Sequence, residues 1–412
     1  MPTGLRLRGI AAVMVSIAAA IVAGWPGSSA FAGTGSSPDL VKGSAYLVSP
    51  ANLIDGHYYR SFGTTADFGL TIDAALALAA TGDQNQALRK IVSFLARGGK
   101  DAGGRTIDLW TGIGTRHASG GAIAKEALLA EVVGANPREF GGRNLIAALD
   151  AAVCPRTGAG GRLRCPAAGS YSYASSVFDQ ALGVIAQLRS GQPGQAAAPV
   201  RYLESLQHTN GSFPSLIPGT GGDVDSTAMA VMALALVPGR AAVDDVSSGV
   251  AWIASRQRSD GGFPGAGGNS VNSAGLAIQA LALRRPAERP HIAAAEAFLA
   301  NEQNADGGFE LAAGGQHRSN LRASAQAVSG AVGIPFGSLR RILSGPTVGG
   351  PDPGPDDGSG SGLGWGSYLA VAVIALAIAA LAGAARSRRR SARRGALPAD
   401  GRQSEPVGRP RR

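Results

Sequence analysis

A short phrase occurs three times in the second half of this 412-residue chain. Its frame is Gln-x-x-[Asp/Asn]-Gly-[Gly/Ser]-Phe, and it occupies residues 207–213, 257–263 and 303–309. Recurrence at a period of about 50 residues indicates a fold made by stacking one supersecondary unit. The phrase therefore constrains the architecture of the chain much more strongly than it constrains the function.

Each phrase lies between two stretches of helical periodicity. A short apolar-periodic stretch precedes it, Asn/Asp-Gly is a turn signal that permits positive φ, and a second, more apolar helix follows. An Ala-Leu or Ala-Val pair in that second helix aligns six such units, whose starts are 47 to 54 residues apart. The six predicted helix starts are Asp67, Ser119, Tyr173, Asp225, Asn272 and Ser319.

Six helical hairpins predict an all-α fold, an (α/α)6 toroid over residues 33–344. The Ala- and Gly-rich helices can pack closely in an inner ring, and the other helices form an outer ring. A closed ring removes the uncovered ends that an open repeat array must cap. An open right-handed superhelix is the alternative.

Targeting segments are expected at both ends of the chain. Residues 1–32 contain two arginines, an apolar run and an Ala-x-Ala site, which is typical of a secretory signal peptide; an uncleaved anchor is the alternative. Residues 365–385 are apolar over the length of a bilayer core and predict a transmembrane helix. The Arg-rich tail, 386–412, predicts a cytoplasmic C-terminus, because positive charge stays inside.

A linker rich in Pro, Gly, Ser and Asp, residues 345–364, joins the toroid to the predicted span and cannot bury apolar area. Arginine outnumbers lysine, and alanine and glycine are abundant, as in proteins of GC-rich bacteria. Together these segments predict a single-pass type I protein of a bacterial cell membrane, with the toroid outside the cytoplasm.

The net charge of +10 belongs to the ends of the chain. The predicted signal peptide accounts for two positive charges and the tail for eight, which leaves the region between them, toroid and linker together, neutral. A neutral extracytoplasmic region gives no electrostatic basis for binding nucleic acid. Cys154 and Cys165, the two cysteines, predict a disulfide in an exported protein, and without a neighbouring His or acidic cluster they do not predict a metal site.

The repeats resemble those of the terpenoid cyclase and protein prenyltransferase superfamily of α/α toroids. The resemblance rests on Gln-x-x-Asp-Gly-Gly-Phe and on the Ser/Thr-Ala-Met-Ala-x-x-Ala-Leu pattern after Asp225, and it covers roughly residues 40 to 340. It implies an (α/α)6 toroid whose central cavity is reached from one end of the inner ring.

Two enzyme hypotheses follow from this fold. Residues 223–229 resemble the Asp-x-Asp-Asp-Thr-Ala motif of class II cyclases, which implies Asp225 as general acid assisted by Asp223 and an isoprenoid substrate. Ser226 replaces the last acid of that motif, and only 5% of the residues are aromatic, although a cation-stabilising cavity needs aromatic walls. An (α/α)6 glycoside hydrolase would need a pair of opposed carboxylates, for which Asp67 and Asp225 are candidates.

A binding function agrees with more of the sequence, and no cofactor is expected. Residues 223–230 also resemble the Val-Asp-Thr-Ala-Ala-Met-Ala phrase of the transcobalamin and intrinsic-factor toroids. This resemblance implies a small-molecule ligand such as cobalamin. We expect the chain to lack the second, β-rich domain of that family, which puts enclosure of cobalamin between two domains in doubt. We therefore expect an exported toroid that holds a small molecule or a partner protein at its cavity without catalysis. The candidate ligand-binding residues are Asp67, Ser119, Tyr173, Asp223, Asp225, Asn272 and Ser319.

Overall fold

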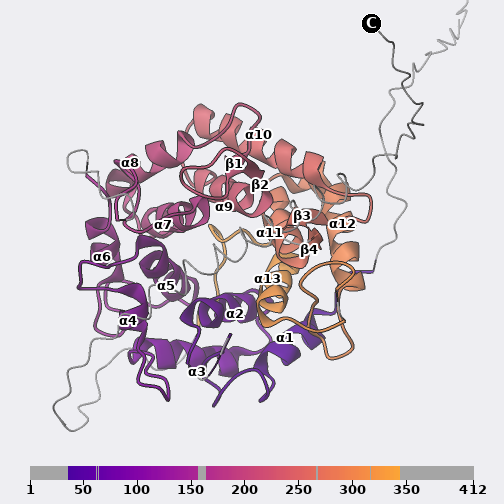
Figure 1. Cartoon of the computed structure of the whole chain (residues 1–412), viewed down its shortest axis with the longest axis horizontal. Helices are drawn as coiled ribbons and strands as arrows, with labels where there is room; N and C mark the ends of the chain where they lie inside the picture. Colours follow the sequence, from indigo (N-terminus) through magenta and orange to yellow (C-terminus); the bar gives the residue numbers. More distant parts are fainter. Residues whose placement is uncertain are drawn as a thin grey trace, which may run out of the picture. The chain divides into compact units, whose positions relative to one another are not determined.

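Figure 1 shows a computed structural model of the chain. It describes residues 36–343 except 62, 64, 156–163, 266, 267 and 316. The predicted signal peptide (1–32), linker (345–364), transmembrane helix (365–385) and tail (386–412) lie outside the described residues. Within the described residues, no helix has both the length and the apolar character needed to cross a bilayer.

Six helices form a closed inner ring (Figure 1). Each packs against the next, and the last packs back against the first. The predicted (α/α)6 toroid is confirmed, and the alternative prediction, an open right-handed superhelix, was wrong. The inner helices are α2 (Phe68–Thr81), α5 (Gly120–Val132), α7 (Val177–Arg189), α9 (Val224–Leu234), α11 (Val271–Leu281) and α13 (Leu321–Val332).

The outer ring covers the inner one, and most of its helices bridge two inner neighbours. Its first helix, α1 (Leu40–Val48), packs against both α13 and α2, so the start of the described chain covers the junction where the ring closes. The short helices α4 (Ile107–Thr111) and η1 (Ala282–Arg284) are additions to the ring. The other outer helices are α3 (Asn85–Ala96), α6 (Leu145–Ala151), α8 (Pro193–Glu204), α10 (Arg240–Arg256) and α12 (Arg285–Asn301).

Small residues allow the inner helices to pack closely. Every residue of α2 from Leu70 to Ala79 is buried, as expected for a helix that is apolar on all sides. Gly275 of α11 meets Gly330 of α13, where a Cβ on Gly330 would lie 2.2 Å from the Gly275 Cα. Any larger side chain at this crossing would force the two helices apart.

The repeated phrase forms a turn that leads from an outer helix to the next inner helix. In the second copy, Gly261 has a φ of 86°, and a Cβ there would lie 2.1 Å from the Ala294 carbonyl oxygen. Asp260 Oδ1 accepts a hydrogen bond from the Gly262 backbone N–H at 2.9 Å, and Phe263 is fully buried. The phrase is therefore part of the scaffold, as the sequence predicted.

The glutamine of each phrase ties the turn to the following outer helix. Gln257 Nε2 donates to the carbonyl oxygens of Gly261 and of His291 in α12, and Gln207 makes the equivalent bonds to Gly211 and to α10. Gln303 has α1 as its neighbour: its Nε2 donates to the Asp39 carbonyl oxygen, and its Oε1 accepts from the Asp39 N–H at 2.7 Å. This last tie closes the outer ring.

Two short antiparallel ribbons lie before inner helices. β1 (Phe213–Pro214) pairs with β2 (Gly222–Asp223) ahead of α9, and β3 (Phe263–Gly265) pairs with β4 (Gly268–Ser270) ahead of α11. The second strand of each ribbon runs directly into the helix. These ribbons form part of the rim around the end of the ring where the inner helices begin.

Four of the six predicted helix starts need correction. Asp67 and Ser119 are N-caps as expected, but α7, α9, α11 and α13 begin after other residues. The alignment failed because the Ala-Leu or Ala-Val pair lies between five and ten residues after the cap, so it does not mark one fixed position in the helix. In place of Tyr173, Asp225, Asn272 and Ser319, the N-caps are Ser176, Asp223, Ser270 and Asn320.

Candidate functional site

The inner helices all begin at the same end of the ring, which we call the mouth. Neighbouring starts are joined by hydrogen bonds: Gly120 N–H donates to the Ser172 carbonyl oxygen, and Val177 N–H donates to the Ser215 carbonyl oxygen. Each inner helix directs its N-terminal end, and with it the positive end of its dipole, toward the mouth. Polar side chains from the first two turns therefore gather there.

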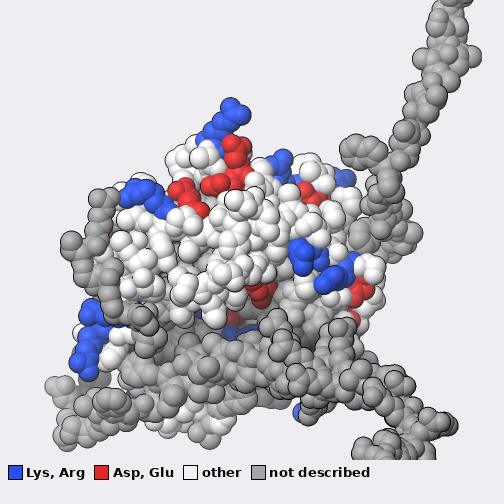
Figure 2. Space-filling model, turned by 45° about the horizontal axis from the view of Figure 1, so that its top comes forward, with Lys and Arg blue, Asp and Glu red and all other residues white. Residues whose placement is uncertain are grey.

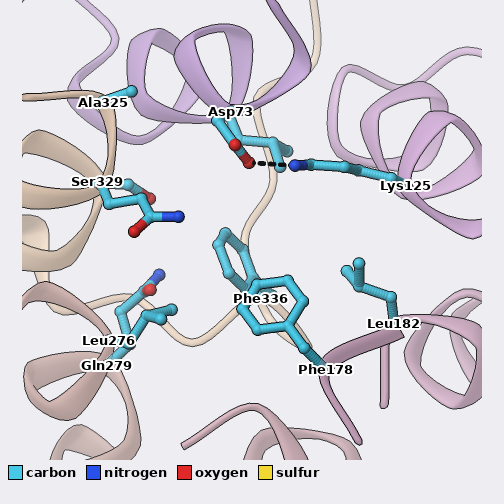
Figure 3. Close-up of a pocket in the computed structure, with 11 residues that line it drawn as sticks. Asp73, Lys125, Phe178, Leu182, Leu276, Gln279, Ala325, Ser329 and Phe336 are labelled. Carbon is cyan, nitrogen blue, oxygen red and sulfur yellow. Dashed lines mark ion pairs between the residues drawn. The ribbon is translucent and has the colours of Figure 1, made fainter. Parts of the chain in front are cut away.

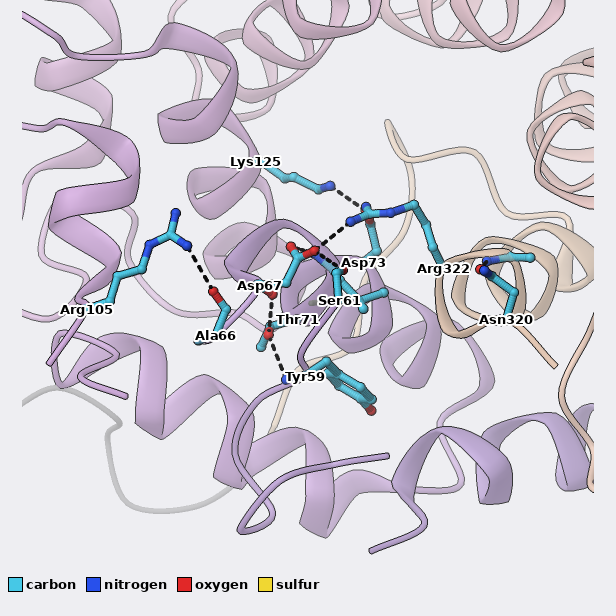
Figure 4. A network of polar contacts seen from close by, with 12 residues as sticks. Tyr59, Ser61, Ala66, Asp67, Thr71, Asp73, Arg105, Lys125, Asn320 and Arg322 are labelled. Atoms are coloured by element: carbon cyan, nitrogen blue, oxygen red, sulfur yellow. Dashed lines mark hydrogen bonds and ion pairs between the residues drawn. The ribbon is translucent and has the colours of Figure 1, made fainter. Parts of the chain in front are cut away.

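Four charged side chains from three inner helices form a chain of ion pairs at the mouth (Figure 4). Arg322 of α13 lies between Asp67 and Asp73 of α2, with nitrogen–oxygen distances of 2.9 and 3.1 Å. Lys125 Nζ of α5 lies 2.7 Å from the other oxygen of Asp73. The side chain of Arg322 is 39% exposed and that of Asp73 is 10% exposed, so the chain runs from the surface of the mouth into its floor.

Asp67 is both a helix cap and a member of this chain of ion pairs. Its Oδ1 accepts from the Leu70 N–H at 2.8 Å, and the Ser61 hydroxyl donates to its Oδ2. Burial disfavours its charged form, but the Arg322 charge and the hydrogen bond from Leu70 outweigh burial and lower the pKa of Asp67. Asp67 is therefore held as a carboxylate at neutral pH.

Asp225, in the first turn of α9, has the opposite environment. Burial, reinforced by the nearby Asp223 charge, raises the pKa of Asp225 to about 7. Its Oδ1 is buried and has no hydrogen-bond partner among the described residues. On the next helix, Asn272 Nδ2 donates to Gln326 Oε1 of α13 at 2.6 Å. This side of the mouth therefore carries a carboxyl group that exchanges its proton near neutral pH.

A C-terminal strap, residues 333–343, closes the other end of the ring. Arg189, at the C-terminal end of α7, donates to the carbonyl oxygens of Phe336, Gly337 and Leu339 at 2.7 to 3.0 Å. Arg189 is itself paired with Glu131 of α5 at 3.2 Å, and burial raises the pKa of Glu131 to about 7. The strap then continues to α5, where the Leu343 N–H donates to the Val133 carbonyl oxygen.

The strap places the Phe336 ring inside the toroid, beside Phe178 (Figure 3). The remaining axial cavity has a volume of about 20 Å³, and Asp73 and Lys125 lie on its mouth side. A cavity of this size holds about one water molecule, whereas ligand pockets usually measure about 300–1,000 Å³. Among the described residues, the cavity that Phe336 and Phe178 border is therefore too small for a polyprenyl chain.

The structure separates the sequence-predicted residues into two groups. Asp67, Asp225 and Asn272 lie at the mouth, Asp223 caps α9 through the Ser226 N–H, and Ser119 is the N-cap residue of α5. Two others take part in loop contacts. The Ser319 hydroxyl donates to Asp306 at 2.6 Å, and the Tyr173 hydroxyl donates to the Arg116 carbonyl oxygen at 3.3 Å.

Three mouth residues were missed by sequence reasoning: Asp73, Lys125 and Arg322. Asp73 and Lys125 each lie six residues after the cap of a helix that is otherwise rich in alanine and leucine. A charge inside such a helix was the available signal, because an unpaired buried charge is costly and needs a partner. Among the described residues, no cluster of three or more His, Cys, Asp or Glu side chains is placed to hold a metal ion.

The predicted disulfide between Cys154 and Cys165 is confirmed, with the two sulfur atoms 2.12 Å apart. It pins the loop that precedes α7. On the face shown in Figure 2, acidic and basic side chains occur in small groups among uncharged residues.

Comparisons with known proteins agree with this fold. Residues 146–320 match the family model of the prenyltransferase alpha-alpha toroid domain. A search of curated proteins returns no match to this sequence. The matched region begins at α6, so it covers the part of the chain where the repeated phrase is clearest.

Two solved structures illustrate the likeness. A protein from Actinoplanes superposes with a TM-score of 0.53 at 19% identity, covering 71% of this chain and 97% of that one. A type II terpene cyclase from Scytonema, in complex with its substrate geranylgeranyl dihydroxybenzoate, superposes with a TM-score of 0.51 at 16% identity, covering 71% and 95%. At these identities the likeness shows the shared fold alone.

Proposed function

We propose that this chain, an α/α toroid of the terpenoid cyclase-like superfamily, is a binding protein that contacts its ligand or partner at the mouth of the ring and does no chemistry on it. The observation that carries the proposal is the axial cavity of about 20 Å³, which Phe336 and Phe178 fill from within. A ligand enclosed in this axial cavity would have no room, so we place recognition at the mouth, where charged side chains from three inner helices gather.

The mouth has the features of a recognition surface. It offers fixed charges of both signs, because Asp67 and Asp73 hold Arg322 and Lys125 in place. Side chains that are already held by ion pairs lose little conformational freedom on binding, which favours affinity. The opposite side of the mouth supplies Asp225, with an acceptor atom that no described residue satisfies.

We further propose that the toroid is exported and anchored in a bacterial cell membrane by residues 365–385. The signal-peptide pattern in 1–32 and the positive tail support this location. The disulfide supports it too, because disulfides persist in oxidising compartments. In that setting the mouth would meet ligands or proteins of the cell exterior.

A class II cyclase-like activity is the second candidate, and one observation favours it. Asp225 matches the general acid of the cyclase motif, and burial and the Asp223 charge raise its pKa to about 7, which keeps much of it protonated at neutral pH. The small axial cavity and Ser226 in place of the motif's last acid argue against this function.

One experiment separates the two functions. The full chain is purified from its native membrane, and co-purifying molecules are identified by mass spectrometry for wild type and Asp225→Asn, with Asp244→Asn, an exposed residue of outer helix α10, as the control. A binding protein retains a ligand or partner that Asp225→Asn loses and the control keeps. Incubation with polyprenyl substrates gives no product in that case. A cyclised product formed by wild type and lost in Asp225→Asn would refute the binding function.

A further inference from the structure

A second concave surface lies outside the ring, beside the disulfide. This groove has a volume of about 940 Å³ and is lined by the loop before α5, by α6 and by the residues around the disulfide. Its floor is apolar, with Ala148, Ala152 and Val153, and three arginines line it: Arg116, Arg143 and Arg164. None of these arginines belongs to the mouth.

The three arginines differ in how they are held. Arg143 is 12% exposed and is already paired with Asp108 at 2.6 Å and Glu126 at 2.9 Å, so its charge is largely committed. Arg116 and Arg164 are exposed, and within the described residues neither is paired with a carboxylate. Arg116 Nε donates to His117 Nε2 at 3.1 Å, which leaves its two terminal nitrogens, so the groove presents two guanidinium groups without a carboxylate partner among the described residues, beside a small apolar floor.

Tyr173 fixes the positions of these two arginines relative to each other. Its N–H donates to the Arg164 carbonyl oxygen at 2.8 Å, and its hydroxyl donates to the Arg116 carbonyl oxygen at 3.3 Å and lies 3.2 Å from His117 Nδ1. Tyr173 has a φ of 57°, a left-handed conformation that costs a tyrosine free energy and persists only where surrounding contacts impose it. The disulfide joins Cys165, the residue next to Arg164, to Cys154.

The chemistry of the groove favours an acidic peptide segment. Guanidinium groups bind carboxylates through paired hydrogen bonds, and small apolar side chains accept a peptide's backbone and prolines. The residues described as lining the groove include no aromatic ring, so it lacks the stacking platforms that sugar rings use. Two available arginines are also too few for the row of phosphate contacts that nucleic acids require.

The chain contains one segment of this kind within reach of the groove. Residues 351–357 read Pro-Asp-Pro-Gly-Pro-Asp-Asp, with three carboxylates and with prolines that favour an extended backbone. The described chain ends at Leu343, beside the C-terminal end of α5, and the groove lies beside the N-terminal end of that 13-residue helix. Along the ring axis the linker must cover the length of that helix, about 20 Å, and it must also pass from the strap to the outside of the ring. The residues between Leu343 and Asp352 can span about 30 Å in all.

We propose that the groove binds the chain's own acidic segment, residues 351–357, with Arg116 and Arg164 pairing with its carboxylates. The segment docks alongside α6 and fixes the path by which the chain leaves the toroid. Without this contact the linker is a free tether; with it, the toroid has a preferred orientation relative to whatever follows residue 357.

Distance measurements on the full chain test this proposal. Cys154 and Cys165 are joined in the disulfide, so engineered cysteines at Ser359 and at the exposed Val243 of α10 take spin labels selectively. An undocked segment of 16 residues has a root-mean-square end-to-end distance of roughly 22 Å, so its distance distribution is broad. We expect a distribution at least about twofold narrower for wild type at low salt, broadening as salt screens the ion pairs.

Charge variants determine whether the arginines are responsible. Arg116→Gln with Arg164→Gln should broaden the distribution to that of the free segment, and Arg258→Gln, an exposed arginine in a repeat turn, should leave it narrow. Arg164→Glu should broaden the distance distribution, and the double variant with Arg164→Glu and Asp356→Arg should narrow the distribution again. A wild-type distribution as broad as that of the double variant would overturn the proposal.

A peptide added in solution separates the chain's own segment from an external partner. In a full chain carrying Asp352→Asn, Asp356→Asn and Asp357→Asn, a synthetic peptide of residues 349–360 should bind and should require Arg116 and Arg164. A scrambled peptide of the same composition should bind at least about tenfold more weakly, a difference of about 1.4 kcal/mol. Equal binding of the two peptides would overturn the assignment, because the groove would then be a general site for acidic partners.

Discussion

The conclusion that the strap fills the inside of the toroid is tested most directly by removing the side chain of Phe336. Phe336 is 8% exposed, and its ring lies in the axial cavity beside Phe178. Phe336→Ala deletes the phenyl group but leaves the strap backbone in place. Arg189 holds three strap carbonyl oxygens, and these hydrogen bonds do not depend on the phenyl group. The space cannot close by movement of the strap alone, so a cavity should remain.

The expected loss of stability in Phe336→Ala follows from that geometry. Phe→Ala substitutions in cores cost about 3–5 kcal/mol, and the cost rises with the volume of the cavity left behind. Phe336 retains some exposure and already borders a small cavity, so we expect a loss of about 3 kcal/mol in the free energy of unfolding. Phe336→Leu keeps an apolar side chain in the ring and should cost less than half as much.

Urea denaturation checks the result. The free energies of unfolding of the wild type and both variants are compared where the slopes of the unfolding curves agree, so that the difference reports stability alone. A loss below about 1 kcal/mol for Phe336→Ala would refute the conclusion that the strap fills the inside of the toroid.

Three further predictions concern the scaffold and the mouth. Gly261→Ala should destabilise the fold by at least about 2 kcal/mol, since it forces a left-handed φ on alanine and places a Cβ 2.1 Å from the Ala294 carbonyl oxygen. Gly194→Ala in α8 is the control, because a Cβ there meets nothing within 4 Å. In the same urea assay it should be neutral or stabilising by up to about 1 kcal/mol. The raised pKa of Asp225, about 7 against an ordinary 3.8, means that the folded state holds its proton more tightly, so this group's contribution to stability falls as pH rises from about 4 to 7 and is level above. Asp225→Asn should therefore gain about 1–3 kcal/mol relative to wild type between pH 5 and pH 8, and an unchanged difference across that range would contradict the raised pKa. Replacing Cys154 and Cys165 by serine should cost about 2–3 kcal/mol by freeing a short loop, measured by thermal unfolding with and without reductant; equal melting temperatures would contradict it.

The architecture was predictable because the turn chemistry repeats. Gly261 requires positive φ and Phe263 requires a buried pocket, and both demands are visible in the residue types themselves. The exact helix starts were less accessible, because capping depends on which of several nearby polar residues reaches a backbone N–H. At α9, Asp223 makes that bond to Ser226, although Asp225 is as good a cap by type.

The contents of the ring could not be predicted from the repeats. Phe336 lies after the last repeat, in a segment without periodicity, and only its position across the ring makes it part of the interior. The same holds for Arg322, whose partners Asp67 and Asp73 lie about 250 residues earlier in the sequence. Contacts between residues so far apart in the sequence depend on closure of the ring. The repeat pattern implies that the ring closes, but it does not show which side chains then meet.

The tie between Asp39 and Gln303 has a consequence for how this protein can be made. The two residues are 264 positions apart, and they join the first outer helix to the last repeat turn. A ribosome or an export channel delivers the chain from its N-terminus, so α1 emerges first and waits for a partner that emerges near the end. The early units can form hairpins as they appear, but the circle is completed only once nearly the whole domain has been released. Long-range closure of this kind slows folding. For much of its synthesis the chain would exist as an open arc with two exposed apolar ends.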